Sequence, residues 1–450
     1  MGSIDRAFEP LSTLGSFHMI FTRLGRKNSA ASTFALAIAL ATGGAFAVTA
    51  LEAPAFAQKE KKEKKAKPQY SKGFIEAYKP LETIAAAEPV DYPAIKAGIP
   101  GLVAAVETDD DRYAAGSFIY SNGAKNQDQA ASLQGMEMML KSGKVPEDKI
   151  GQFNFVAGQV AYAAKNYAKA RPYFQAAADA GYTENDPMIF VAESYFAEDQ
   201  PQQGLTYLSD LINAKIAAGE TVDEGWLRRG LAQAYNNQLN SEVRKYSTWY
   251  VTQHPSDESW RDAVAILLNT GGYQNPEILD LLRLGQRAGV LNDAKLYLEY
   301  MDAADYRRLP AEVVSLIDEG YAKGVLDKTD PYVVDTRRQA AERAVKDRAD
   351  LAGLKADADK AGASIATVLA AGDTLLALSE PADAETYYAK AVNMPGANAP
   401  MVLTRLGIAQ FDQGKLAEAK ATFDKVEGAR EAIANLWAIY ATQQASGAAM

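Results

Sequence analysis

Asp and Glu are the side chains that could supply acid–base chemistry in this 450-residue chain. It has two histidines and no cysteine, which excludes disulfides, Cys/His zinc sites and nucleophiles activated by a paired histidine. His18 lies in a segment that we expect to be removed, and His254 precedes Pro255 at an expected helix end. No Gly-x-x-x-x-Gly-Lys-Ser/Thr loop is present to hold phosphates. We therefore predict no metal and no cofactor.

Three groups of carboxylates remain as candidates for catalysis. The run Asp109–Asp111 immediately precedes a predicted helix, where carboxylates cap the first-turn amides and suit the helix dipole. Glu193–Ser194 and Glu258–Ser259 resemble the Glu-Ser pair of lytic transglycosylases, but the downstream Gly-Leu-Met-Gln-type segment of that family is missing. We predict that the chain is not an enzyme. A carboxylate-dependent peptidoglycan-processing enzyme with a helical superhelix is the alternative.

Small and aromatic residues recur at fixed offsets and predict the elements that position the polar side chains. The four copies are Gly158, Ala170, Phe174 and Ala177; Gly372, Ala384, Tyr388 and Ala391; Gly407, Ala419, Phe423 and Val426; and, in looser form, Ala192, Gly204, Leu208 and Leu211. Small residues let two helices approach closely, and the aromatic residue fills the gap between them. Each copy therefore predicts a helical hairpin that must stack on its neighbours.

The period of these copies indicates a family. Gly158 and Ala192 are 34 residues apart, and Gly372 and Gly407 are 35 apart. With the turns at Asn166–Ala170 and Gln413–Ala419, the chain resembles tetratricopeptide repeat proteins, here of the exported bacterial kind. The resemblance implies an all-α fold, a tetratricopeptide-like α-solenoid of antiparallel helix hairpins. It also implies a scaffold that binds a protein or peptide.

The same resemblance implies which residues contact the partner, because first-helix positions line the inner surface of such repeats. Carried over from the register, the candidates are Gln159, Tyr162, Glu193, Phe196, Thr404, Phe411 and Asp412. Aromatic rings mixed with amide and carboxylate groups suit an extended peptide, whose backbone needs hydrogen-bond partners. The Lys, Asn and Arg carboxylate clamp of chaperone-tail binders is missing. Two other positions on this face, Phe155 and Ile189, fit packed core equally well.

Turn-forming residues predict where helices begin and end. Stops are expected at Gly98 with Pro100, at Asn122–Gly123 and at Ser142–Gly143, and starts at Asp186–Pro187 and Ser256–Asp257. The segment Val334 to Lys360 is long and charged with few apolar anchors, so its charges are expected to form a solvated face.

The N-terminal region has the pattern of an export signal. A basic stretch precedes an apolar run and two Ala-Phe-Ala sites, at Ala45–Ala47 and Ala55–Ala57. We expect cleavage after Ala57, with Met19 as an alternative start, and a periplasmic protein as the product. Lys59 to Lys67 is then a linker and the one segment that could contact a membrane. A structural solenoid held at the membrane by an uncleaved signal is the other alternative.

The net charge predicts the class of partner, and the composition along the chain predicts the domain organisation. The net charge of −10 argues against a nucleic-acid partner. The predicted segments are a signal region (1–57), a Lys-rich linker (58–69), N-terminal hairpins (70–148), a repeat block (149–218), divergent helical repeats (219–333), a long charged segment (334–362), a second repeat block (363–428), and a C-terminal capping helix with its tail (429–450).

Overall fold

Capping side chains and left-handed glycines divide the chain into short helices. The computed structural model describes residues 68–447, so the predicted signal and the Lys59 to Lys67 arm lie outside it. Ser71, Asp91 and Asp128 each accept a first-turn amide hydrogen bond at the start of a helix. Gly143 and Gly181 follow helix ends with φ of 65° and 76°. Residues 68–447 contain helices and no strands, which confirms the all-α prediction.

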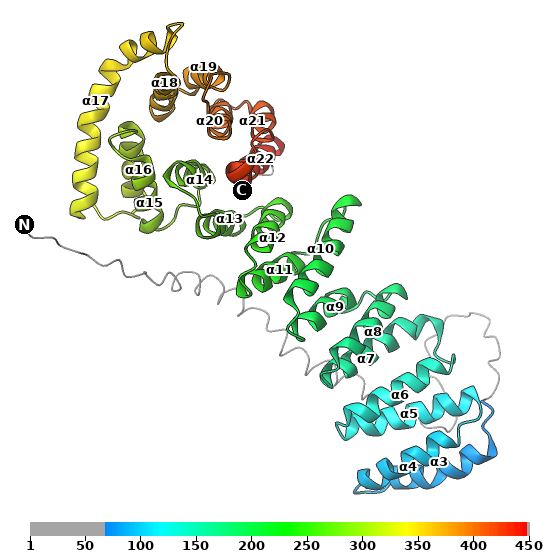
Figure 1. Ribbon diagram of the computed structural model, residues 1–450. Coiled ribbons are helices and arrows are strands. Elements are labelled where there is room, and N and C mark those ends of the chain that lie inside the picture. Colours follow the sequence, from blue (N-terminus) through cyan, green and yellow to red (C-terminus); the bar gives the residue numbers. More distant parts are fainter. Residues whose placement is uncertain (1–67, 448–450) are drawn as a thin grey trace, which may run out of the picture. The chain divides into compact units, whose positions relative to one another are not determined.

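The chain divides into two compact units, Met1–Leu211 and Ile212–Met450, with the division inside one helix. The helices of unit 1 are α3 (Lys72–Ala85), α4 (Tyr92–Ala104), α5 (Asp109–Lys125), α6 (Gln129–Lys141), the 3-10 helix η2 (Glu147–Lys149), α7 (Ile150–Ala163), α8 (Tyr167–Asp179) and α9 (Pro187–Phe196), and α10 (Pro201–Ala217) crosses the division. Consecutive helices pack as antiparallel hairpins (Figure 1).

Unit 2 is also built of helical hairpins and contains one long helix. Its helices are α11 (Glu224–Asn236), α12 (Asn240–Gln253), α13 (Asp257–Thr270), α14 (Asn275–Arg287), α15 (Ala294–Ala304), α16 (Pro310–Ala322), α17 (Pro331–Asp359), α18 (Ile365–Ala377), α19 (Pro381–Ala391), α20 (Ala399–Asp412), α21 (Leu416–Phe423), the 3-10 helix η3 (Gly428–Arg430) and α22 (Glu431–Ser446). No helix within 68–447 is both long and apolar enough to cross a membrane.

Two predicted helix stops are wrong. Gly98 and Pro100 lie inside α4, and Gly123 lies inside α5. A Cβ on Gly98 would come within 2.3 Å of the Leu81 side chain, and one on Gly123 within 2.7 Å of the Ser132 amide nitrogen. These glycines therefore permit close helix contact, and they do not end helices.

The repeated glycine and aromatic spacing forms the core of each hairpin. A Cβ on Gly158 would lie 2.7 Å from the ring of Phe174, and one on Gly407 would lie 2.5 Å from the ring of Phe423. Both rings are at most 1% exposed. The aromatic ring of the second helix thus occupies the space where the first helix lacks a side chain, as expected for tetratricopeptide-like hairpins.

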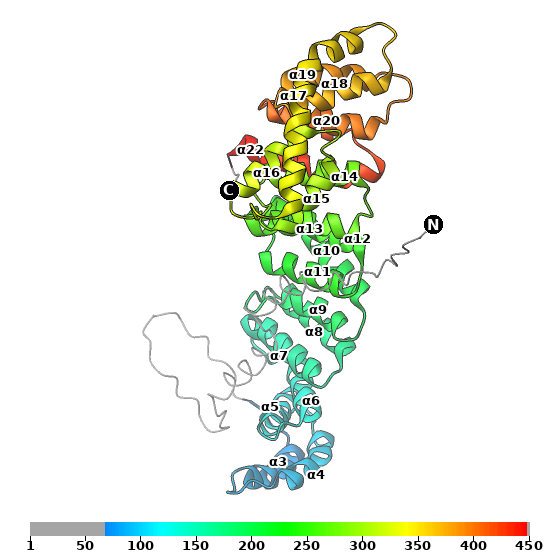
Figure 2. The same cartoon turned by 90° about the vertical axis from the view of Figure 1, so that its left-hand side faces the viewer.

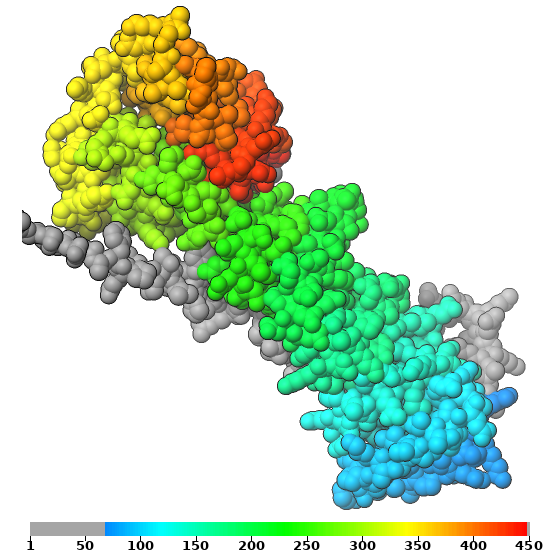
Figure 3. Space-filling model, viewed as in Figure 1, coloured from blue at the N-terminus to red at the C-terminus, as the bar shows by residue number. Residues whose placement is uncertain are grey.

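Unit 2 closes on itself, as Figure 1 shows. Helix α14 contacts both α20 and α22, which come more than 100 residues later. In the space-filling view, the red C-terminal segment abuts the green segment that contains α13 and α14 (Figure 3). The C-terminal helix was predicted as a cap, and it packs here against an early hairpin of the same unit.

Unit 2 therefore forms a closed ring of helices. Helix α17 connects the part of the ring that ends at α16 with the part that begins at α18. It packs on α16 at one end and on α18 at the other, and it runs lengthwise along the side of unit 2 that faces the viewer in Figure 2. Its buried apolar residues, Val333, Ala340, Leu351 and Ala358, recur at helical spacing on one face.

Candidate partner-binding surfaces

The predicted binding residues of unit 1 lie on the first helices of two consecutive hairpins. They are Gln159 and Tyr162 on α7, and Glu193 and Phe196 on α9. All four are half-buried. The two helices meet through Phe155, which is 2% exposed and whose ring lies 5.4 Å from that of Phe190. Phe155 is therefore core, whereas the four predicted residues keep part of their surface accessible.

The two aromatic candidates also pack within their own hairpins. The Tyr162 ring lies edge-on to that of Tyr167, with centroids 4.9 Å apart. A Cβ on Gly204 would come within 2.3 Å of the Phe196 ring, so this ring covers the glycine. These contacts fix the orientation of both rings. A partner would meet a preformed surface to which Gln159 and Glu193 add amide and carboxylate groups.

The three predicted residues of unit 2 are engaged inside the chain. Thr404 is fully buried and its hydroxyl donates to the Pro400 carbonyl oxygen at 2.7 Å. The Phe411 ring lies 5.4 Å from the rings of both Trp437 and Tyr440 of α22. Asp412 accepts two hydrogen bonds from the guanidinium of Arg287, at 2.6 and 2.5 Å. A partner at these positions would have to displace α22 or α14.

The acidic run Asp109–Asp111 has a structural role. Thr108 and Asp111 form a capping box at the start of α5. Asp111 is fully buried and accepts amide hydrogen bonds from Ser71, Glu107 and Thr108 at 3.0 to 3.1 Å. Burial disfavours its charge, but these hydrogen bonds outweigh burial and lower the pKa of Asp111. The run thus ties the segment before α3 to α5.

The Glu258–Ser259 pair and His254 are also held by structural contacts. Glu258 lies 3.4 Å from a guanidinium nitrogen of Arg228, and Ser259 forms a capping box with Ser256 at the start of α13. The Nε2 atom of His254 lies 2.8 Å from the carbonyl oxygen of Val222. Within 68–447, no three His, Asp or Glu side chains gather as a metal site would require.

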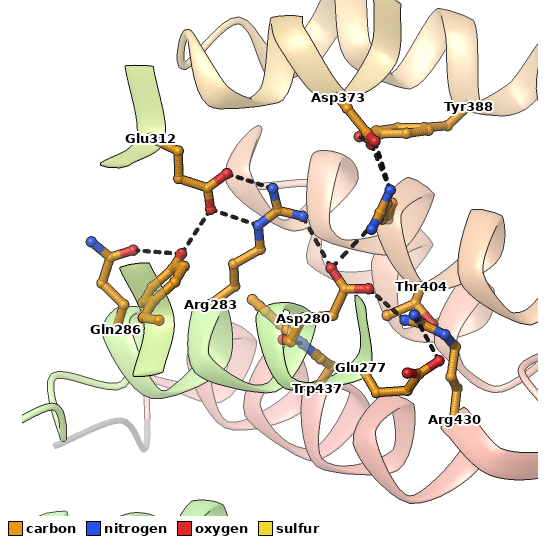
Figure 4. Close-up of polar contacts among 12 residues, drawn as sticks. Glu277, Asp280, Arg283, Gln286, Glu312, Asp373, Tyr388, Thr404, Arg430 and Trp437 are labelled. Atoms are coloured by element: carbon orange, nitrogen blue, oxygen red, sulfur yellow. Dashed lines mark hydrogen bonds and ion pairs between the residues drawn. The ribbon is translucent and has the colours of Figure 1, made fainter. Parts of the chain in front are cut away.

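The most buried polar cluster is a network centred on Asp280 of α14 (Figure 4). Asp280 is 0% exposed and accepts hydrogen bonds from Arg283 at 3.0 Å and from Arg430. Arg405 of α20 lies 3.6 Å away through its Nε atom. The indole of Trp437 donates to the Asp280 carbonyl oxygen at 2.9 Å. One residue of α14 therefore binds side chains of α20, η3 and α22.

Further carboxylates extend this network to α16 and α18. Glu312 accepts two hydrogen bonds from Arg283, at 2.7 and 2.6 Å, and a third from the Tyr300 hydroxyl at 2.8 Å. Asp373 accepts from Arg405 at 2.7 Å and from the Tyr388 hydroxyl at the same distance. Each acid faces a base or a hydroxyl, so the cluster joins the two sides of the ring through charged hydrogen bonds. We call this cluster, centred on Asp280, the ionic clasp.

Electrostatics keep the centre of this clasp charged. Burial opposes the ionisation of Asp280, but the positive charges of Arg405, Arg283 and Arg430 outweigh burial and hold its pKa below the usual range. Burial also opposes the charge of Arg283, but the negative charge and the hydrogen bonds of Glu312 outweigh burial and keep the pKa of Arg283 well above its ordinary value. Protonation changes near neutral pH are therefore not expected at these groups.

Our sequence reasoning missed this network. The available signal was the segment Leu279–Leu284, in which Asp280 and Arg283 stand among four leucines. Charged residues in such a segment are rare unless they are paired when buried. The partners, Arg405 and Arg430, are more than 100 residues away, and no local pattern connects them to α14.

Comparison with known proteins adds little to these observations. No family model matches the chain, and no curated protein matches it. Among solved structures, one similar chain is from the "Crystal structure of APC/C hetero-tetramer Cut9-Hcn1", with 13% identity, 84% of each chain covered and a TM-score of 0.19. The class of the protein follows from its own hairpins: it is an all-α solenoid of tetratricopeptide-like repeats.

Proposed function

We propose that this protein is a non-catalytic scaffold that binds a protein or peptide partner on the first-helix face of α7 and α9. One observation carries the proposal. The polar and aromatic positions of this face are half-buried in unit 1, whereas their counterparts on α20 are occupied by α14 and α22. Repeat stacking supports such a surface, because each hairpin extends the face of the one before.

The chemistry of this face suits an extended peptide. Tyr162 and Phe196 supply ring surface for apolar side chains, and Gln159 and Glu193 supply hydrogen-bonding groups for a peptide backbone. The acidic groups held by Arg283, Arg405 and Arg430 in the clasp are structural, which supports a function without a reaction.

We further propose that the protein is exported to a bacterial periplasm and takes part in envelope assembly, secretion or polysaccharide export. The basic stretch, the apolar run and the two Ala-Phe-Ala sites before residue 58 support export. N-terminal sequencing of the protein from a periplasmic extract should begin at Gln58. A chain that begins at Met1 or Met19 would contradict a cleaved signal.

Affinity capture from an envelope extract tests the binding face. The full-length protein is compared with a double variant, Gln159→Ala with Glu193→Gln, which changes polar groups and leaves the packed rings in place. We expect recovery of the main partner to fall at least tenfold. Gln203→Ala, an exposed position on α10, is the matched control and should capture as the natural protein does. Equal recovery by the double variant would refute this face as the binding site.

A further inference from the structure

The ring of unit 2 closes along a seam, where α14 meets the surface formed by α20, η3 and α22. The arc of helices α11 to α16 lies on one side of the seam, and the arc α18 to α22 lies on the other. Figure 1 shows α17 on the opposite side of the ring, where it joins the two arcs. With this arrangement the ring can open as two rigid arcs that turn about the ends of α17.

Helix α14 presents charges of both signs to the seam. Asp280 lies against Arg405 and Arg430 of the opposite arc (Figure 4). Seven residues further on, Arg287 donates two hydrogen bonds to Asp412, at 2.6 and 2.5 Å. Residues seven apart lie on the same face of a helix. The arc α18 to α22 therefore already binds a helix, through a pair of arginines for one carboxylate and an aspartate for one guanidinium.

The surface that α14 covers is the first-helix face of the second repeat block. Phe411 and Asp412 belong to α20 and stand at positions predicted to contact a partner. Stacked hairpins present such faces as extended binding surfaces. In the closed ring, Arg287 of α14 binds Asp412. Helix α14 thus occupies this face as an internal ligand, in the manner of a helix in a groove.

The seam also contains buried donors without acceptors. Eight buried side-chain atoms within 68–447 have no hydrogen-bond partner, and four of them are the Nε and Nη2 atoms of Arg405 and Arg430. Two of the four lie near a carboxylate, at 3.6 Å from Asp280 and 3.1 Å from Glu277, without forming a hydrogen bond. Both arginines are 2% exposed. Water would satisfy these donors if the arcs separated, so closure of the seam costs free energy that opening recovers.

The largest ring of the seam is packed within its own arc. Trp437 of α22 stacks on Phe423 at 5.6 Å and lies 5.4 Å from Phe411, and both of these partners belong to the arc α18 to α22. One ring pair, Trp260 with Tyr440, crosses between the arcs at 5.1 Å. Separation of the arcs would leave the Trp437 stack intact, because both of its ring partners move with it.

We propose that the closed ring is an autoinhibited state, in which α14 covers a docking surface on α20, η3 and α22 that takes a helix of a partner protein when the ring opens. The partner helix carries a carboxylate that takes the place of Asp280 between Arg405 and Arg430. Seven residues later it carries an arginine that takes the place of Arg287 at Asp412. These two charges fix the direction of the helix along the surface. The proposal is independent of the face on α7 and α9.

Peptide binding to a full-length variant with a weakened seam tests the covered surface. Arg287→Asp places a carboxylate opposite Asp412, and it changes α14 without changing the surface. The probe is a labelled peptide with the sequence of residues 272–289, which contains α14. In the natural protein the tethered α14 has a high effective concentration and excludes the peptide. We therefore expect Arg287→Asp to bind the peptide at least tenfold more tightly in fluorescence anisotropy. A peptide with Lys in place of Asp280 should bind this variant at least tenfold more weakly.

Distance measurements test the opening itself. The chain has no cysteine, so Asn269→Cys on α13 and Ala421→Cys on α21 place two spin labels at exposed positions in different arcs. Double electron–electron resonance should show a single distance with the natural seam and a second, longer distance with Arg287→Asp. Adding Asp412→Arg to Arg287→Asp restores opposite charges and should restore the single distance. Arg287→Gln, a milder change, should act in the same direction as Arg287→Asp but to a smaller extent.

The matched control is Arg307→Asp, because Arg307 is exposed and its ion pair with Asp305 lies outside the seam. It should behave as the natural protein does in both experiments, and circular dichroism should show equal helix content in all variants. An unchanged distance in Arg287→Asp, or peptide binding no tighter than that of the natural protein, would overturn the proposal. A mixture of Arg287→Asp and Asp412→Arg proteins that sediments as a dimer, when neither does so alone, would assign the surface to α14 of a second copy instead.

Discussion

Two buried aspartates of unit 2 have pKa values shifted in opposite directions, because their neighbours differ. Asp280 is surrounded by three arginines and stays ionised. Asp262 on α13 is 4% exposed, and its Oδ2 atom has no hydrogen-bond partner among the described residues. Burial, and then the nearby charge of Glu258, raise the pKa of Asp262 to about 6, although Arg261 and Arg228 oppose this.

Asp262 should therefore make the protein less stable at neutral pH. Its folded-state pKa lies above the unfolded value, so protonation favours folding, and this contribution is lost as the pH rises from about 4 through 6. Two pKa units correspond to about 3 kcal/mol. We expect Asp262→Asn to raise the free energy of unfolding in urea by about 2 to 3 kcal/mol at pH 7.5, and much less at pH 4.5.

The control for this experiment is Asp350→Asn, an exposed position on α17. It should leave the urea midpoint unchanged at both pH values. A gain from Asp262→Asn that is equal at both pH values would show that packing, and not the charge, is responsible.

At the scale of the helix, the glycine and aromatic pair recurs where we did not predict it. Gly230 of α11 and Tyr246 of α12 are 16 residues apart, as are Gly158 and Phe174. A Cβ on Gly230 would lie 2.0 Å from the fully buried Tyr246 ring. The repeated spacing did not predict this pair, because Glu242 stands where the other copies have a small residue, 12 positions after the first one. Packing of the ring on the glycine is enough to form this hairpin.

Substitution of Gly230 by Ala should destabilise unit 2. Alanine favours a helix by up to about 1 kcal/mol over glycine, but its methyl group would overlap the Tyr246 ring, at a cost of about 1 to 3 kcal/mol. Gly101→Ala, inside α4 and with no atom within 4 Å of its Cβ, should instead raise stability. Thermal unfolding followed by circular dichroism gives both signs, and a Gly230→Ala protein as stable as the natural one would contradict the contact.

At the scale of the whole unit, closure depends on α22. Trp437 is fully buried, stacks on Phe423 with centroids 5.6 Å apart and donates to Asp280. Tyr440 donates to the Arg287 carbonyl oxygen at 2.7 Å, and Gln443 bridges Trp260 and Val251 at 3.1 and 2.8 Å. The hydrogen bonds among these contacts span 153 to 192 residues, so α22 holds the ring closed as well as covering the last hairpin.

Trp437→Ala should therefore loosen α14, far away in the sequence. Loss of the indole costs about 3 to 5 kcal/mol, and we expect faster amide hydrogen exchange in α14 and α20 than in α18. Val345→Ala, at an exposed apolar position, should leave exchange in all three helices unchanged. Exchange that rises only in α21 and α22 would show that the ring stays closed without the indole.

Local sequence patterns determined the helices, the hairpins and the solenoid class, because capping residues and glycine–aromatic packing act within about 35 residues. They also placed Gln159, Tyr162, Glu193 and Phe196 on first helices, although their role in binding stays a prediction. The tertiary structure alone decided that Thr404, Phe411 and Asp412 are engaged inside unit 2. It also decided that Asp280, Arg283, Arg405 and Arg430 form one clasp. Ring closure brings together residues more than 100 positions apart, and no helical period encodes that contact.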